Sequence, residues 1–589
     1  MIGNPWFAYK CLRGRTQDAQ PNNYNAISQS TINRTMHLRT NSQGQSPSNN
    51  QYFINVPGEY SSLKPSAESH EAMCIQLPAP SAVRGVPSGA FVAVPKIAQR
   101  LLHLALPSFL INLVSDAQHS EQTKTRSRKI ASLDGLRGLA CLFVFHAHYA
   151  YSFSNCLEEA GSDVLKGRTM YQPYISLLWS GISMVNVFFF VSGYVLVGKS
   201  LRQIRSDNVP GALSTISSAV FRRALRLYIP SMAIIMVNVV MAHLHLFDAG
   251  SIFYWQAHSG VVGPQEAPPP RLGSLAAQIY DGLKDCYRMF DNTVPWGRFN
   301  IPYEWEGNAR PGGTIYDRHL WTIPVEFRCS MLIFMVLIST ARLRSYWRIS
   351  IHVAFALNCL LSERFHETLF LAGMVCAEID IITEHFCVES NQTPLSGPQG
   401  THTLAIEEES VRIVGWRLLV TSRRFRHVHN LMMFITGLFF LSIPPQDYYG
   451  YAEWRPALSM VPLYIQEKDD VIRAIGAIMT TWPVATSTII APLFCNPVAQ
   501  YLGQISFALY LVHGAVLRSV WLGLQPSVIN FVSGVPVWAM PTGQFIRLWI
   551  MGYLIVLPVV IWSADLFWRL VDQPSISFAR WIEERLTRR

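Results

Sequence analysis

The stretch ASLDGLRGLACLFVFHAHYAYSF, residues 131–153, joins a charged entrance to a long apolar run. Asp134 and Arg137 stand near its start, and His146 and His148 lie well inside the apolar part. An apolar run of this length is typical of a helix that crosses a bilayer. Ionisable side chains at membrane depth are costly, so their presence here indicates a functional site.

The composition of the whole chain also favours a membrane protein. Of 589 residues, 50% are hydrophobic and only 15% are charged, and the mean hydropathy is +0.19. Soluble domains carry about 25% charged residues. The 48 Lys and Arg residues outnumber the 38 Asp and Glu residues. Because they fall between apolar runs, they indicate orientation in a membrane rather than nucleic-acid binding.

Apolar runs after residue 130 predict an all-α, polytopic membrane helix bundle of about ten transmembrane helices, since each span needs about 20 mostly apolar residues. The predicted spans lie near 136–153, 175–198, 228–247, 320–340, 347–363, 367–383, 429–445, 472–493, 500–525 and 545–570.

Segments of different composition flank this membrane domain, which we place at 131–575. Residues 1–95 are rich in Asn, Gln, Ser and Pro and predict a disordered polar tail. Residues 96–130 contain a short apolar run followed by KTRSRK, which predicts an interfacial helix and a basic linker. Residues 576–589 form a short basic tail.

Loop charges predict the orientation. Lys and Arg residues gather at 124–129, 199–226, 342–348 and 417–426 and in the C-terminal tail, all on one side of the predicted bundle. Positive charge favours the cytoplasmic side, so both termini are expected there. The organelle, endomembrane or plasma membrane, stays open. The sequons at Asn33 and Asn391 fall on predicted cytoplasmic segments and are interpreted as chance matches.

Helical spacing distinguishes the two histidines of the first span. Arg137 and His148 are eleven residues apart, roughly 1100° of rotation, so they share a face about 16 Å apart along the axis. Asp134 lies near the same stripe, whereas His146 lies on the opposite face. We therefore select His148 as a general base that takes a proton from a hydroxyl, while Arg137 holds a negatively charged donor.

The cysteines and histidines show no metal-binding pattern. The ten cysteines are scattered, without a C-x-x-C pair or a His/Cys cluster at zinc spacing. No metal and no bound cofactor is predicted from the sequence.

The sequence resembles the membrane acyltransferase 3 family in five ordered motifs. LDGLRG followed by an apolar run and His148 resembles the family's first span, and VNVFFFVSGYVLVGK (185–199) resembles its F-F-V-L-S-G-Y segment. FRRALRLYIP, HLWTIPVEFRCSML and LGQISFALYLVH resemble three further family motifs. The resemblance covers about 130–575, and the polar N-terminal tail and HLWTIPVEFR look most like fungal members.

This resemblance implies transfer of an acyl group, often acetyl, from acyl-CoA to a hydroxyl, with His148 and Arg137 in the catalytic roles. Acyl-CoA, in particular acetyl-CoA, is then a co-substrate. For a fungal-type member the expected acceptor is a small secondary metabolite with a hydroxyl group. A glycan or lipid acceptor remains an alternative.

Arginines and a glutamate in other predicted spans complete the candidate site. Arg222, Arg223 and Arg226 cluster on one helix side and could bind the CoA phosphates. The alternative is that they only set the orientation of the chain in the membrane and contact anionic lipid. Glu326, inside a span, is expected in the active site, where it orients His148 or stabilises its imidazolium; the alternative is a structural pair with Arg328 or a neighbouring helix.

Further polar side chains border the predicted spans. His319 and Trp321 are placed beside the acceptor, and Tyr510 and His513 share a helix face that contributes to substrate binding or only to helix contacts. Buried His, Glu and Arg residues would also suit a proton-coupled transporter. A measurement of CoA-dependent acylation distinguishes an acyltransferase from such a transporter.

Overall fold

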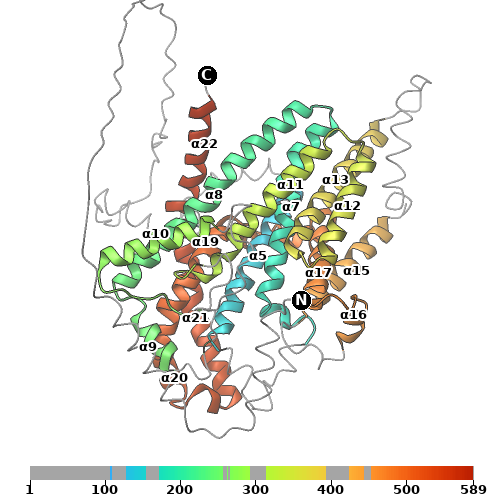
Figure 1. Ribbon diagram of the computed structural model, residues 1–589. Coiled ribbons are helices and arrows are strands. Elements are labelled where there is room, and N and C mark those ends of the chain that lie inside the picture. Colours follow the sequence, from blue (N-terminus) through green and yellow to red (C-terminus); the bar gives the residue numbers. More distant parts are fainter. Residues whose placement is uncertain are drawn as a thin grey trace, which may run out of the picture. The chain divides into compact units, whose positions relative to one another are not determined.

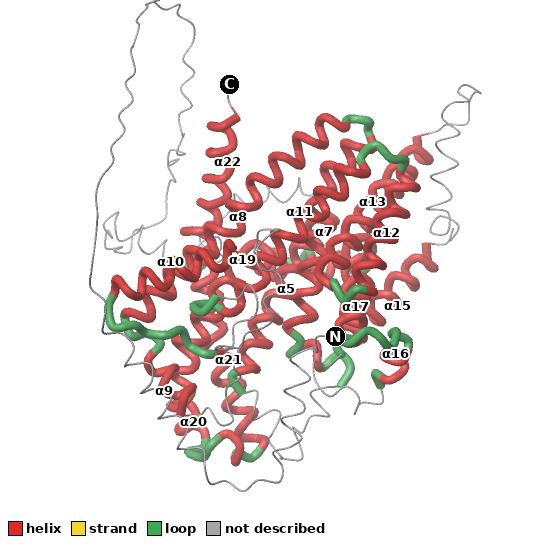
Figure 2. Tube along the Cα trace, in the orientation of Figure 1, coloured by secondary structure: helices red, strands yellow, loops and turns green. Residues whose placement is uncertain are grey.

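The computed structural model describes residues 106–108, 128–153, 172–256, 262, 266–291, 314–392, 423–443 and 453–587. Regular structure in these residues is entirely helical, and none of them forms a strand (Figure 2). All belong to one compact unit that begins at Pro95. The predicted 1–95 tail and most of the 96–130 linker lie outside the described residues.

The unit is a series of long helices joined largely by short helical turns and loops (Figure 1). The longer helices are α5 (Arg128–Tyr151), α7 (Gly181–Arg205), α8 (Val209–His243), α10 (Leu275–Asp291), α11 (Thr322–Thr340), α12 (Ser345–Leu361), α13 (Phe365–Gln392), α15 (Arg423–Leu441), α17 (Lys468–Thr486), α19 (Pro497–Val516), α20 (Leu522–Val532), α21 (Thr542–Phe567) and α22 (Gln573–Thr587). The shorter ones are η2 (Ser176–Leu178), α9 (Asp248–Gln256), η4 (Arg318–Trp321), α16 (Arg455–Ser459), α18 (Ala491–Phe494), η6 (Leu517–Trp521), η7 (Val537–Ala539) and η8 (Trp568–Asp572).

Among the described residues, 6 helical segments are long and apolar enough to cross a membrane. They are Lys129–Tyr151, Gly181–Arg205, Val209–His243, Arg318–Thr340, Pro497–Val532 and Thr542–Thr587. These six correspond to six of the predicted spans, which confirms a membrane-type helical fold. The other four predicted spans also fall on helices, namely α12, α13, α15 and α17. The count of about ten stays a prediction.

Of those four helices, α12 is short and α13 carries a buried charge. Helix α12 has 17 residues, about 25 Å, which is shorter than the roughly 30 Å hydrocarbon core. Helix α13 carries Glu378 in its interior, and this carboxylate is buried. Arg348 of α12 donates to Glu378 from Nε at 2.7 Å. The two helices therefore satisfy each other's charges within the bundle.

Glycines allow the closest helix contacts. A Cβ built on Gly138 of α5 would lie 2.3 Å from the backbone nitrogen of Gly503 in α19. A Cβ on Gly193 of α7 would lie 2.2 Å from the carbonyl oxygen of Phe370 in α13. Small residues let backbones approach in membrane bundles. Gly138 of the LDGLRG motif thus allows α5 to pack closely against α19.

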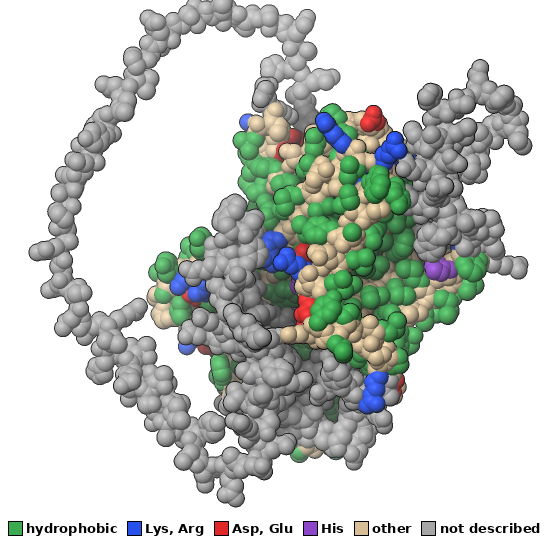
Figure 3. All heavy atoms as spheres, turned by 45° about the vertical axis from the view of Figure 1, so that its right-hand side comes forward, with side chains coloured by type: hydrophobic (Ala, Val, Ile, Leu, Met, Phe, Trp, Pro, Cys, Tyr) green, Lys and Arg blue, Asp and Glu red, His purple; other side chains and the backbone are tan. Residues whose placement is uncertain are grey.

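Helices far apart in sequence meet at the two ends of this unit. Helix α22 packs against α8 at one end, and α9 packs against α20 at the other (Figure 1). Hydrophobic side chains cover much of the described face in Figure 3, as a lipid-facing surface requires. The described part of the 96–130 segment contacts α21, because the Ser108 backbone N–H donates to Asp565 Oδ2 at 3.0 Å.

Candidate active site

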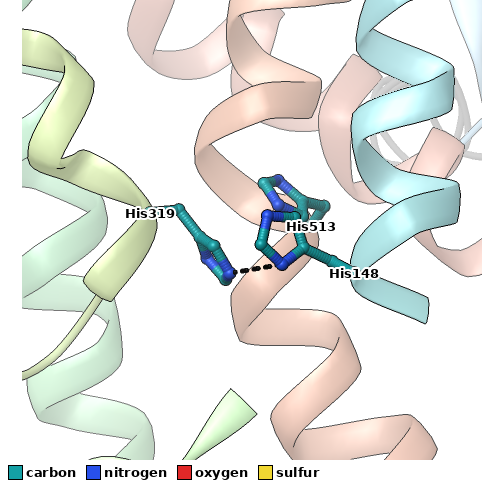
Figure 4. Close-up of side chains that lie close together, drawn as sticks. All are labelled: His148, His319 and His513. Carbon is teal, nitrogen blue, oxygen red and sulfur yellow. Dashed lines mark hydrogen bonds between the residues drawn. The ribbon is translucent and has the colours of Figure 1, made fainter. Parts of the chain in front are cut away.

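Three histidines from distant parts of the chain converge in the bundle (Figure 4). His148 comes from the last turn of α5, His319 from η4 and His513 from α19. The Nδ1 atom of His148 lies 3.1 Å from Nε2 of His319. The ring centroid of His513 lies 5.1 Å from that of His148 and 4.6 Å from that of His319. These rings form the histidine cluster.

A buried carboxylate from outside the spanning helices joins the cluster. Oε1 of Glu266 lies 2.7 Å from Nδ1 of His148 and 3.4 Å from Nε2 of His319. The Glu266 side chain is 1% exposed. Burial alone would raise its pKa, but the interactions with His319 first and then with His148, including their hydrogen bonds to the carboxylate, hold the pKa well below the usual range. Glu266 is therefore ionised and orients the His148 ring.

His319 is fixed by a second carboxylate. Asp317 accepts from Nδ1 of His319 at 2.8 Å and lies 3.3 Å from an Arg518 nitrogen. Burial would raise the Asp317 pKa, but Arg518 and then His319 lower it to about 2. A Cβ on Gly514 would lie 2.4 Å from Nδ1 of His319, so only glycine leaves room for this ring.

His513 is held from the backbone side. Its Nδ1–H donates to the carbonyl oxygen of Leu509 at 3.2 Å. Its Nε2 is buried and has no hydrogen-bond partner among the described residues. Tyr510, one turn earlier, hydrogen-bonds the His319 carbonyl oxygen and lies 2.7 Å from Thr322 Oγ1. Tyr510 and His513 thus support the cluster from one face of α19.

His146 occupies a different environment from His148. Its ring packs among three aromatic side chains, at centroid distances of 5.2 Å from Trp179, 4.9 Å from Trp549 and 5.2 Å from Tyr553. Its Nε2 makes no hydrogen bond within the described part of the chain. The two histidines lie on opposite sides of α5, as their spacing predicts.

Arg137 lies at the other end of the face that carries His148. It forms an ion pair with Asp134 at 3.3 Å and donates to Ser506 Oγ at 3.0 Å. It also donates to the Gly503 carbonyl oxygen at 3.2 Å. Because Gly503 and Ser506 belong to α19, the face shared by Arg137 and His148 packs along that helix.

The structure does not bring Glu326 to His148. Its carboxylate pairs with Arg223 of α8 and accepts from Ser192 Oγ of α7. The expected contact between Glu326 and His148 is therefore not formed, and Glu326 instead makes the alternative pair with a neighbouring helix. The carboxylate beside His148 is Glu266.

The three arginines of α8 have separate environments. Arg222 pairs with Glu583 of α22 at 3.2 Å, and Arg223 pairs with Glu326. Arg226 is exposed and forms no ion pair with a described residue. Trp321, at the end of η4, lies 5.8 Å from the His366 ring by centroids. It is not part of the histidine cluster.

Sequence reasoning missed Glu266 and Asp317. Asp317 stands two residues before His319, a local signal that could have been read. Glu266 lies in the long connection between α9 and α10, and only the tertiary fold carries it to His148. The proximity of the three histidines could not be predicted from the sequence either, since successive members of the cluster are separated by more than 170 residues.

The chain is similar to one family model and to several curated proteins. A family model described as an acyltransferase domain matches residues 130–377. The O-acetyltransferase PaAT-1 of Phomopsis amygdali is 27% identical over 503 residues, covering 84% of this chain and 91% of the relative. The acyltransferase clz18 of Cochliobolus lunatus is 24% identical, covering 75% and 93%.

A third relative, the acyltransferase R4 of Phoma sp. (strain ATCC 20986 / MF5453), is 24% identical, covering 76% of this chain and 94% of its own. No solved structure matches the chain. The family match includes the first-span motif and ends within α13, and the fungal relatives extend the likeness across most of the remaining helices. Residues 130–377 match the acyltransferase family model, and this match together with the acyltransferase-named relatives identifies the chain as an acyltransferase.

Proposed function

We propose that this protein is an integral-membrane O-acyltransferase that moves an acyl group, acetyl in the first instance, from acyl-CoA to a hydroxyl of a small secondary metabolite. The observation that carries the proposal is the contact between His148 and the buried carboxylate of Glu266. A relative whose name states O-acetyl transfer supports the choice of acyl group and acceptor atom.

His148 acts as the general base. When Glu266 accepts from Nδ1–H, the lone pair of the neutral ring is on Nε2. The His148 side chain is 16% exposed, which leaves this nitrogen reachable. Nε2 removes the proton of the acceptor hydroxyl as its oxygen attacks the thioester carbonyl carbon. The carbon–sulfur bond then breaks, and the CoA thiolate leaves and takes up a proton.

Positive charge on the side of α8 and α5 suits the CoA phosphates. Arg226 is exposed, and the charge of Arg137 acts on it. Guanidinium groups bind phosphate well. With both termini on the cytoplasmic side, these arginines face the compartment that contains CoA. Arg222 and Arg223 already have carboxylate partners, so Arg226 takes the leading part in this arrangement.

Two matched substitutions in the first span test this function. Membranes that contain wild type, His148→Gln or His146→Gln receive labelled acetyl-CoA and a pool of hydroxylated metabolites, and label in product is followed. We expect His148→Gln to lower the rate by about 10²- to 10⁴-fold, the usual contribution of general-base catalysis. His146→Gln should stay within a few-fold of wild type at equal protein level. Undiminished transfer by His148→Gln would remove that residue from the mechanism.

A further inference from the structure

The histidine cluster contains a buried ring nitrogen, Nε2 of His513, that has no hydrogen-bond partner among the described residues. Asp317 takes the Nδ1 proton of His319, and the Leu509 carbonyl oxygen takes that of His513. In the neutral ring of His513, Nε2 then carries a lone pair, whereas Nε2 of His319 faces Nδ1 of His148 and Oε1 of Glu266. The Nε2 of His513 is left without a hydrogen-bond partner in a residue that is 1% exposed. A buried acceptor nitrogen without a hydrogen-bond donor destabilises the folded protein unless a cation binds to it.

The spacing of these atoms suits a small metal ion. Ligand nitrogens of His148, His319 and His513 all lie within 4.8 Å of one another. Tetrahedral Zn²⁺ with bonds of about 2.0–2.1 Å needs ligands roughly 3.3 Å apart. The 3.1 Å contact between His148 and His319 and the 3.4 Å contact between His319 and Glu266 are close to that spacing. A small outward movement of His148 and inward movement of His513 would complete it.

The outer contacts are those that metal-binding histidines make. Ligating imidazoles usually donate their other N–H to a carboxylate or a backbone carbonyl, which fixes the tautomer and the ring orientation. His319 does so to Asp317, and His513 does so to Leu509. Arg518, fully buried, lies 3.3 Å from Asp317 and fixes that carboxylate in turn.

We propose that His148, His319 and His513, with Glu266 as an oxygen ligand, bind a divalent transition-metal ion such as Zn²⁺, and that binding inhibits the enzyme. The effect on activity rests on the proposed function, whereas the binding rests on the geometry alone. Metal coordination at Nδ1 of His148 displaces the proton from that nitrogen. The neutral ring then carries its proton on Nε2, so Nε2 loses the lone pair that would accept the hydroxyl proton.

Binding is tested first, without substrate. The full-length chain, purified in detergent through a histidine-free tag and treated with chelator, is titrated with Zn²⁺ by calorimetry and with Co²⁺ by visible absorption. We expect a site of one ion per chain with the spectrum of tetrahedral Co²⁺. Asp317→Asn should weaken it by about 10- to 100-fold, His513→Gln should weaken it at least as much, and His146→Gln should leave it unchanged. Size-exclusion profiles confirm that each variant is folded.

The inhibition is then measured as label transfer from acetyl-CoA with and without Zn²⁺. We expect saturating Zn²⁺ to abolish transfer by wild type and by His146→Gln, and excess chelator to restore it. His513→Gln should need at least tenfold more Zn²⁺ for half-inhibition. Wild type that binds no ion, or folded His513→Gln and Asp317→Asn variants that bind like wild type, would overturn the metal site. Transfer that is insensitive to a demonstrably bound ion would overturn its inhibitory role.

The two proposals fail separately. Absence of acyl transfer from the chelated wild type would count against the proposed function while the titration still decides the metal site. Conversely, transfer with no Zn²⁺ or Co²⁺ binding would keep the acyltransferase mechanism and remove the metal site.

Discussion

Glu266 and Glu326 are buried or nearly buried carboxylates with different partners. Glu266 contacts the two imidazoles of His148 and His319, whereas Glu326 contacts Arg223 and Ser192. A carboxylate beside a general base stabilises the imidazolium that forms during proton transfer. A carboxylate that pairs with a fixed guanidinium chiefly joins two helices. The same side chain thus has two distinct tasks in this bundle.

Exchanging each carboxylate for its amide separates these tasks. We expect Glu266→Gln to lower kcat by between about 10- and 10⁴-fold at unchanged protein level, because the charge that orients His148 is gone. Glu326→Gln should instead destabilise the protein by about 1–3 kcal/mol, since Arg223 loses its charged partner. Label transfer at saturating substrate and thermal unfolding followed by size exclusion measure the two effects.

The double variant Glu326→Gln/Arg223→Gln provides the control, because it removes both charges of the pair. Its thermal stability should lie above that of Glu326→Gln alone. If Glu326→Gln abolished transfer at full stability, Glu326 would belong to the catalytic machinery, and if Glu266→Gln retained full activity, Glu266 would not.

Helix α5 depends on its glycines for its position against α19. Gly138 meets the Gly503 backbone, and the neighbouring Arg137 reaches Ser506 and the Gly503 carbonyl across the same contact. Any added methyl group must separate the two helices. Since His148 and His513 lie farther along this helix pair, a change in the crossing would also change the histidine cluster.

Gly138→Ala tests this contact. Because its Cβ would lie 2.3 Å from a backbone nitrogen, we expect a loss of about 1–3 kcal/mol of stability from overpacking, seen as a lower midpoint of thermal unfolding. Gly198→Ala is the matched control, since a Cβ there meets only the Arg202 side chain at 3.7 Å and alanine favours a helix by up to about 1 kcal/mol. Equal stability of Gly138→Ala and wild type would disprove the close contact.

Helices were more predictable from the sequence than contacts between them. Each of the predicted apolar runs falls on a helix, because a helix satisfies its backbone hydrogen bonds within its own segment. The face shared by Arg137 and His148 followed from the same periodicity. The carboxylate partner of His148 could not be predicted from periodicity, because Glu266 belongs to a long connection whose position in the fold no local sequence pattern specifies. Glu326 was the carboxylate expected beside His148 because it lies inside a predicted span.

At the scale of the molecule, loop charge predicts which side of the membrane each connection faces. The six spanning helices agree with a membrane protein but do not fix its direction. The connection between α10 and η4 is expected opposite the termini, and the connection between α13 and α15 on their side. Because these two connections are expected on opposite sides of the membrane, one reporter in each determines the orientation.

Glycosylation of a sequon shows that its connection faces the lumen, so it reports the orientation of the chain in the membrane. Pro302→Thr turns Asn300-Ile301-Pro302 into an acceptor sequon in the first connection, and the natural sequon at Asn391 serves as the reporter for the second. In microsomes we expect Pro302→Thr to gain one endoglycosidase-sensitive mobility step and the wild type to show none. Modification of Asn391 in the wild type would reverse the orientation, and the CoA site would have to be placed elsewhere.

Glu266 and Asp317 both lie outside the six spanning segments. A carboxylate at the centre of a helix costs about 2.5–3.5 kcal/mol when the helix is inserted into a bilayer. These two acids do not add that penalty to the insertion of a spanning segment, because they belong to the chain between the spans. His148 therefore has its carboxylate only when the chain between α9 and α11 is folded against the bundle, so the competence of the base depends on that connection as well as on the spanning helices.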